Sequence, residues 1–120
     1  MSNQGYTLTK DVTFHTAAVL TANGEHVDVK GFQQVMLQIV GINADTVTFE
    51  VTLDGTNWVA LRGINLATGV VATTSTVNGI FLVTIAGASL FRARLTRVAG
   101  TVTITGRIST GIGGAYFIAA

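Results

Sequence analysis

The feature that most constrains this chain is the strict alternation of apolar and polar residues that opens residues 46–61, TVTFEVTLDGTNWVAL. An apolar side chain occupies every second position from Val47 to Leu53, with threonine or glutamate between. Successive side chains of a strand point to opposite faces, so one face should line a core and the other should meet solvent or a partner. Asp54-Gly55 is a tight-turn signal, and the residues after it predict a returning strand.

The rest of the sequence also favours strands over helices. Valine, isoleucine and threonine are abundant, and no segment has the apolar spacing of an amphipathic helix. We expect strands in residues 12–21, 26–30 and 34–39, with the charged second one at a sheet edge. Residues 62–78 predict a long connection with one or two short strands. Residues 79–87 are apolar at both odd and even positions. This pattern indicates either a central strand covered on both faces or a strand with one face packed against another subunit.

About eight or nine short strands of this kind imply an all-β fold with two packed antiparallel sheets. We predict a β-sandwich of jelly-roll or Greek-key type, with a closed β-barrel as the alternative. Its core should contain Phe49, Phe91 and Trp58, the last being the only tryptophan. The predicted organisation is a polar N-terminal arm in residues 1–10, the sandwich in 11–109, and a glycine-rich then apolar tail in 110–120.

Residues 90–109 predict a hairpin if Ala99-Gly100 is a two-residue turn, with a three-residue loop as the alternative. In that register Phe91 faces Ile108 on an apolar side. The opposite side then collects three arginines, Arg92, Arg94 and Arg107. This arginine face is either a solvated surface or a patch that binds an acidic surface of a neighbouring protein.

The tail ends in an apolar run that includes Tyr116, Phe117 and Ile118. Chain termini usually fray in water, so an apolar end is unusual for a monomer. The run either covers the open end of its own sandwich or docks on a neighbouring subunit. We therefore regard these three residues, together with the three arginines, as candidate interface residues.

The charge of the chain favours an assembly. Only 11% of the residues are charged, against about 25% in a typical soluble domain, and the net charge is +1. A nearly neutral chain with no aromatics between its arginines predicts neither nucleic acid nor an anionic membrane as partner. We expect no signal peptide and no transmembrane segment, and so synthesis in the cytoplasm. With no cysteine, neither a disulfide nor a thiolate metal site can form.

The search for catalytic patterns is largely negative. The acidic residues form no spaced pair, the serines lie in no nucleophile elbow, and His15 and His26 have no carboxylate cluster near them in sequence. Residues 111–114 open no helix, which argues against a phosphate-binding loop. We therefore predict a protein that is not an enzyme, with no cofactor and no metal. An alternative role for Trp58 is a platform on which a sugar ring stacks.

FEVTLDGTNWVAL followed by FRARLTRVAGTVTITGRIS resembles small β-sandwich virion proteins of tailed bacteriophages. The resemblance covers residues 46–61 and 79–109. It implies a non-enzymatic component of the virion, such as a capsid decoration, neck, tail or fibre-base protein, whose partners are capsid or tail proteins. Such proteins are oligomeric, and trimers are common among them. The alternative function is a carbohydrate-binding β-sandwich module, although this chain lacks the disulfide and secretion signal of lectin-type modules.

Overall fold

The computed structural model describes residues 8–110, which form eleven strands and no helix. The apolar alternation that defines the sequence therefore corresponds to strands throughout this part of the chain. No helix in these residues could cross a membrane. The strands are β1 (Thr9–Ala18), β2 (His26–Asp28), β3 (Gln34–Val40), β4 (Thr46–Thr52), β5 (Val59–Ala60), β6 (Gly63–Asn65), β7 (Val71–Ala72), β8 (Thr74–Ser75), β9 (Gly79–Thr84), β10 (Leu90–Thr96) and β11 (Val102–Ser109).

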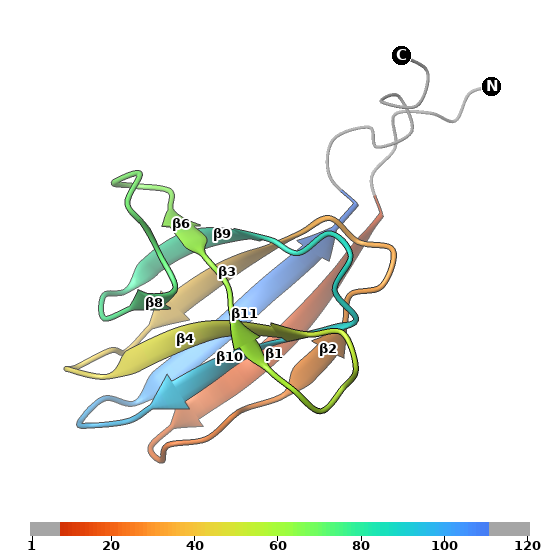
Figure 1. Cartoon of the computed structure of the whole chain (residues 1–120). Helices are drawn as coiled ribbons and strands as arrows, with labels where there is room; N and C mark the ends of the chain where they lie inside the picture. Colours follow the sequence, from red (N-terminus) through yellow and green to blue (C-terminus); the bar gives the residue numbers. More distant parts are fainter. Residues whose placement is uncertain (1–7, 111–120) are drawn as a thin grey trace.

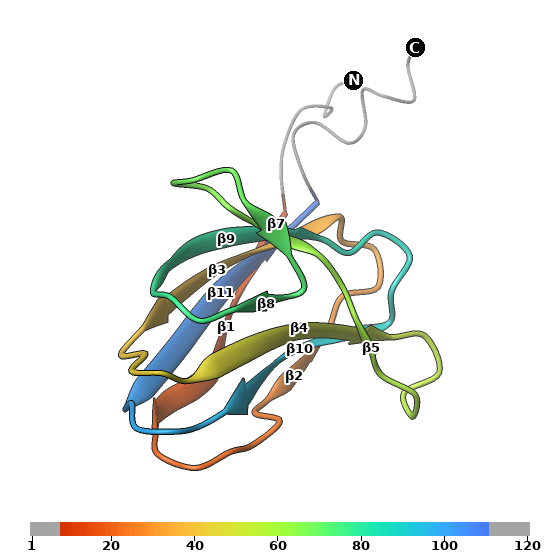
Figure 2. The ribbon, with the colours of Figure 1, turned by 60° about the vertical axis from the view of Figure 1, so that its left-hand side comes forward.

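The strands pack as two antiparallel sheets (Figures 1 and 2). The six-stranded sheet has the order β1-β11-β3-β9-β6-β7, and the five-stranded sheet has β2-β10-β4-β5 with β8 paired to β4. Among residues 8–110 neither sheet closes on itself, so the predicted sandwich is confirmed and the alternative of a closed barrel is wrong. The count exceeds the expected eight or nine because the connection after β5 contributes three very short strands, β6, β7 and β8.

The hairpin predicted for residues 90–109 does not form. β10 pairs with β2 and β4 in one sheet, whereas β11 pairs with β1 and β3 in the other. Phe91 and Ile108 are both fully buried, but they reach the core from opposite sheets. Alternation shows only which side chains point inward. It is satisfied equally by a neighbouring strand and by a strand facing across the core.

A buried carboxylate fixes the crossing from β10 to β11. Asp45 lies between β3 and β4 and is fully buried; its carboxylate accepts hydrogen bonds from the backbone N–H groups of Asn43, Val98, Ala99 and Gly100. Burial by itself would raise the pKa of Asp45, but these four donors outweigh it and lower the pKa to about 2. The ionised carboxylate therefore ties the loop at residues 98–100 to the end of the sandwich, where a tight turn was expected.

The core lies between the sheets and is built by inward-facing residues of both. Phe49 is 1% exposed and Phe91 is 0% exposed. Two aromatic pairs join the layers. Phe14 of β1 meets Phe91 of β10 edge to face at 5.5 Å between ring centroids, and Phe49 of β4 meets Phe81 of β9 at 5.7 Å. These pairs connect strands that share no ladder hydrogen bonds, so they hold one sheet against the other.

Two glycines allow the phenylalanine rings to pack against the backbone. A Cβ atom on Gly106 of β11 would lie 2.7 Å from Cε2 of Phe14, and one on Gly63 of β6 would lie 2.8 Å from Cε2 of Phe49. Real Cβ atoms do not come so close to another carbon. The absence of a side chain at these two positions is therefore a condition of the core packing.

Several local predictions can be compared with the strands. The unit at residues 46–61 is a strand with a returning partner, since β5 pairs with β4. β2 is an edge strand, as its charge suggested. Leu53, expected to face the core, is 74% exposed because β4 ends one residue earlier. β1 begins at Thr9, inside the predicted N-terminal arm; the remainder of that arm, residues 1–7, lies outside the described residues.

Candidate functional site

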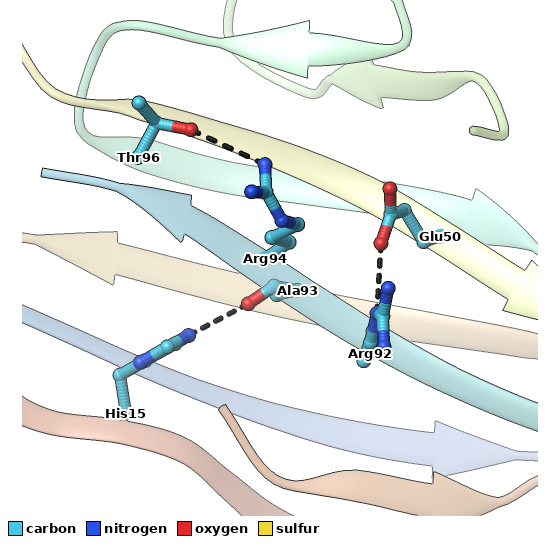
Figure 3. Close-up of polar contacts among 6 residues, drawn as sticks. All are labelled: His15, Glu50, Arg92, Ala93, Arg94 and Thr96. Carbon is cyan, nitrogen blue, oxygen red and sulfur yellow. Dashed lines mark hydrogen bonds and ion pairs between the residues drawn. The ribbon is translucent and has the colours of Figure 1, made fainter. Parts of the chain in front are cut away.

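A polar cluster occupies the outer face of the five-stranded sheet. Strand register places His26, Arg92, Glu50 and Ala60 in one row across β2, β10, β4 and β5. Nε of Arg92 donates a hydrogen bond to Oε1 of Glu50 at 2.7 Å, and the two side chains are only 15% and 16% exposed (Figure 3). An ion pair shielded from water in this way holds its geometry more firmly than an exposed pair.

Trp58 belongs to this cluster and not to the core, so its predicted core position is wrong. The indole is half-buried, and Cζ of Arg92 lies 4.0 Å from the centroid of the Trp58 ring system. The ring of His26 is 6.3 Å away, centroid to centroid. The guanidinium of Arg92 therefore binds the carboxylate of Glu50 and stacks on the indole at the same time, which is a favourable cation–π arrangement.

The turn that carries Trp58 is fixed by Asp54. Its carboxylate accepts hydrogen bonds from the backbone N–H groups of Thr56 and Asn57, from the Asn57 amide and from the Thr52 hydroxyl. The backbone donors come first among the causes that hold the pKa of Asp54 well below its ordinary value. Gly55 has a φ of 81°, the left-handed conformation that a tight turn needs. The Asp-Gly turn prediction is thus confirmed, and the turn places Trp58 over the outer face.

Arg94 lies two residues after Arg92 on the same outer face. Its Nη1 is 3.5 Å from the hydroxyl of Thr96, and within residues 8–110 it forms no ion pair with a carboxylate (Figure 3). A half-buried guanidinium with one long hydrogen bond retains donors for an additional acceptor. Arg94 is therefore the member of the predicted arginine face that is best placed for a polar contact with a partner.

Arg107 does not share a face with Arg92 and Arg94, so the predicted grouping of three arginines is wrong. Arg107 is on the outer face of the six-stranded sheet, the opposite side of the molecule, because β10 and β11 belong to different sheets. Its Nε donates a hydrogen bond to Oδ1 of Asp11 at 2.7 Å, in a pair that is 65% and 71% exposed. That hydrogen bond, followed by the charge of the guanidinium, lowers the pKa of the Asp11 carboxyl.

The outer face of the six-stranded sheet carries a row that changes from charged to apolar. Register aligns one outward residue from each strand across the whole sheet, in the order Asp11, Arg107, Met36, Leu82, Ile64 and Val71. The first two form the ion pair, and the other four are apolar. Met36 is 43% exposed, Ile64 is 38% exposed and Val71 is 49% exposed. Contiguous apolar exposure of this kind is typical of surfaces that contact another molecule.

A shallow groove of about 720 Å³ lies on the same face, over β1, β11 and β3. Polar side chains such as Gln34, Gln38 and Thr105 line it together with Met36 and Ile80. The face thus has a hollow part over β1, β11 and β3 beside an apolar part over β9, β6 and β7. The first alternative for residues 79–87, a central strand covered on both faces, is wrong within this chain, since Ile80 is 42% exposed.

The two histidines lie in different environments, His15 in the core and His26 near Trp58 on an outer face. His15 is buried, and its Nε2 is 2.7 Å from the carbonyl oxygen of Ala93 in the facing sheet (Figure 3). It is buried beside Phe14 because irregular pairing around residues 13–18 of β1 interrupts the expected alternation. In the part of the chain that the structure describes, no group of three or more histidine, aspartate or glutamate residues could hold a metal ion.

The remaining candidate interface residues, Tyr116, Phe117 and Ile118, lie outside the described residues.

The strand order and the two packed sheets define a small all-β sandwich protein. Residues 8–108 match the protein family described as XepA, and the chain belongs to that family. No curated protein matches the sequence.

Two solved structures have the same sandwich. The SPBc2 prophage-derived protein YomS aligns with a TM-score of 0.83 at 22% identity, over 91% of this chain and 99% of YomS. The PBSX exported protein XepA aligns with a TM-score of 0.81 at 18% identity, over 86% of this chain but only 38% of XepA. The relationship to phage-derived proteins that the sequence resemblance indicated is thereby confirmed.

Proposed function

We propose that this protein is a structural component of a bacteriophage particle, a capsid decoration or a neck or tail protein. In this proposal it acts without catalysis, through contacts with other virion proteins in a homo-oligomeric assembly. The observation that carries the proposal is the segment 63–91. These residues contain no aspartate, glutamate, lysine, arginine or histidine, yet many of their large apolar side chains are exposed. A surface of this kind gains free energy when a partner removes it from water.

Two further observations support a binding role. The buried or strongly hydrogen-bonded carboxylates, those of Asp45 and Asp54, are committed to fixing loops. The ion pairs of Arg92 with Glu50 and of Arg107 with Asp11 are likewise satisfied within the chain. These groups therefore hold the fold together, and apolar contact and the donors of Arg94 are what the chain offers a partner.

The direct test is the protein composition of particles. Particles released from the host strain that carries the gene are purified on a density gradient and their proteins are identified by mass spectrometry. We expect this protein to sediment with the particles and to remain bound after a wash at high salt, because apolar contacts are not screened by ions. Recovery of the protein only from the soluble fraction of the lysate, with particles complete without it, would refute the proposal.

The C-terminal run is proposed to be one of the anchors. Deletion of residues 111–120, which include Tyr116, Phe117 and Ile118, should reduce attachment to the particle while the strand content, measured by circular dichroism, remains unchanged. If the deleted chain loses its strand signal, the run serves the fold of its own domain.

An Arg94→Ala variant tests the proposed polar contact in the same attachment assay, and Lys30→Ala, at an exposed ion pair, is its control.

A carbohydrate-binding module remains the second candidate, and one observation favours it. Trp58 is half-buried on the outer face of the five-stranded sheet, next to Arg92 and Glu50, so that an aromatic ring and polar groups adjoin there. Sugar rings stack on exposed indoles and bond to such groups. This function predicts that a glycan quenches or shifts the fluorescence of Trp58, the only tryptophan, and that Trp58→Ala abolishes retention on a glycan column. A glycan array with no signal for the intact protein would eliminate it.

A further inference from the structure

The apolar part of the six-stranded sheet is continuous in two directions. Along the row, Met36, Leu82, Ile64 and Val71 are neighbours on four adjacent strands, β3, β9, β6 and β7. In the next row Ile80 of β9 pairs with Gln38 of β3. We call the surface formed by Met36, Ile64, Val71, Ile80 and Leu82 the apolar face. Four of its members come from residues 63–91 and Met36 comes from β3, and strand register brings the five side chains together.

The chemistry of the apolar face restricts what can cover it. The segment that supplies four of its five residues has no ionisable side chain, and the nearest charges in the row, Asp11 and Arg107, already neutralise each other. A partner with charged groups would lose their hydration and find no opposite charge in return. The matching surface must therefore be uncharged and largely apolar.

Such a surface is present on every copy of this chain. The hollow over β1, β11 and β3 shares Met36 and Ile80 with the apolar face. Apart from the paired Asp11 and Arg107, the residues that line it are uncharged. A second copy can thus place its apolar face against the apolar face and hollow of the first, in the manner of two packed sheets. Both surfaces of the contact are thus present on each copy of this chain.

We propose that the outer face of the six-stranded sheet is the surface through which copies of this chain associate, with the apolar face at the centre of the contact. The inference rests on the proposed function, since it names the self-contact within the oligomer. The five-stranded sheet, with its polar cluster around Arg92 and Trp58, then stays available for a different partner.

The test measures the oligomeric state of the full chain by size-exclusion chromatography with light scattering over a series of concentrations. Ile64→Lys introduces a charge at the middle of the apolar face. We expect the intact chain to be oligomeric. In this variant the dissociation constant of the oligomer should rise by about tenfold or more, because the lysine would be buried without an opposite charge. Leu20→Lys is the matched control, since Leu20 is an exposed apolar residue away from this face, at 74% exposure. It should leave the oligomer unchanged.

A second measurement does not depend on how the lysine variant folds. The chain has no cysteine, so Ile64→Cys and Leu20→Cys each introduce one thiol. In the oligomer, the thiol at position 64 should be alkylated at about one tenth of the rate of the thiol at position 20, or more slowly. In urea the two rates should be equal. Equal alkylation rates in native buffer, a monomeric intact chain, or an oligomer that persists in Ile64→Lys would each overturn the inference.

The outcome is separable from that of the proposed function. A chain that is found in particles but is monomeric in solution, or whose thiol at position 64 is unprotected, refutes the self-contact and leaves the structural role intact. An oligomer that Ile64→Lys dissociates, in a protein that never sediments with particles, supports the self-contact and refutes the structural role.

Discussion

The close approach of Gly106 to the Phe14 ring allows a stringent test of the sandwich core. In Gly106→Ala the new Cβ would lie 2.7 Å from Cε2 of Phe14 and 3.2 Å from the carbonyl oxygen of Met36. The ring cannot retreat freely, because Phe14 is 2% exposed and packs edge to face on Phe91. Overpacking of this kind costs about 1–3 kcal/mol. For a domain of this size, the melting temperature should fall by about 4 °C for each kcal/mol.

A second substitution isolates the cause. Phe14→Leu removes the ring atoms that the Cβ would meet and by itself costs about 1–2 kcal/mol for the space left behind. In the double variant the alanine methyl occupies part of that space, so the total cost should be smaller than the sum of the single costs by about 1 kcal/mol. Urea unfolding of all four proteins, followed by circular dichroism, gives the coupling free energy.

Gly87 provides the control for backbone effects. A Cβ there would meet no atom within 4 Å, but its φ of 92° disfavours any side chain. Gly87→Ala should therefore be destabilising through its backbone, and its cost should add to that of Phe14→Leu. The reasoning is refuted if Gly106→Ala and Phe14→Leu are also additive within about 0.5 kcal/mol, because a steric clash with the ring must be relieved when the ring is removed.

Three further outcomes follow from the polar contacts. The pKa of Asp45 is about 2 in the folded chain against 3.8 for the free group, so its contribution to stability is present above pH 3.8 and is lost as the pH falls toward 2. The melting temperature of Asp45→Asn should accordingly depend less on pH in this range than that of the intact chain. Gly100→Ala should be destabilising by about 1–3 kcal/mol in urea unfolding, because its Cβ would collide with the Asp45 carboxylate and the Gly41 carbonyl oxygen. Arg92→Ala should expose the indole of Trp58, so that acrylamide quenches its fluorescence more strongly than in Arg94→Ala, whose side chain has no such stacking contact.

The predictions that held depended on local chemistry. The tight turn at Asp54-Gly55 requires only a residue that tolerates positive φ and a side chain that bonds to its own backbone, and both are visible in two letters of sequence. The returning strand β5 and the edge strand β2 followed from alternation and charge over a few residues. Turns and short strands of this kind are favoured by their own residues, whatever fold surrounds them.

The predictions that failed depended on which strands become neighbours. The sequence predicts Arg107 on the same face as Arg92 because a hairpin and a crossing between sheets bury the same residues. In the structure the chain crosses between the sheets, and Asp45 holds the loop at residues 98–100. The size of Trp58 predicts a core position. An indole that stacks on a guanidinium is stabilised at the surface, and no pattern near Trp58 indicates that Arg92 will lie beneath it.

By itself the sequence determined that the chain forms strands, that most of its alternating apolar side chains point inward, and that it carries unusually little charge. Those properties arise from the two-residue period of a strand and from composition, and they need no knowledge of partners. The tertiary structure alone decided that Met36, Leu82, Ile64 and Val71 form one apolar row and that the arginines divide between two faces. Strand order and register are set by long-range packing free energy, which is shared among all the strands and is not encoded in any one of them.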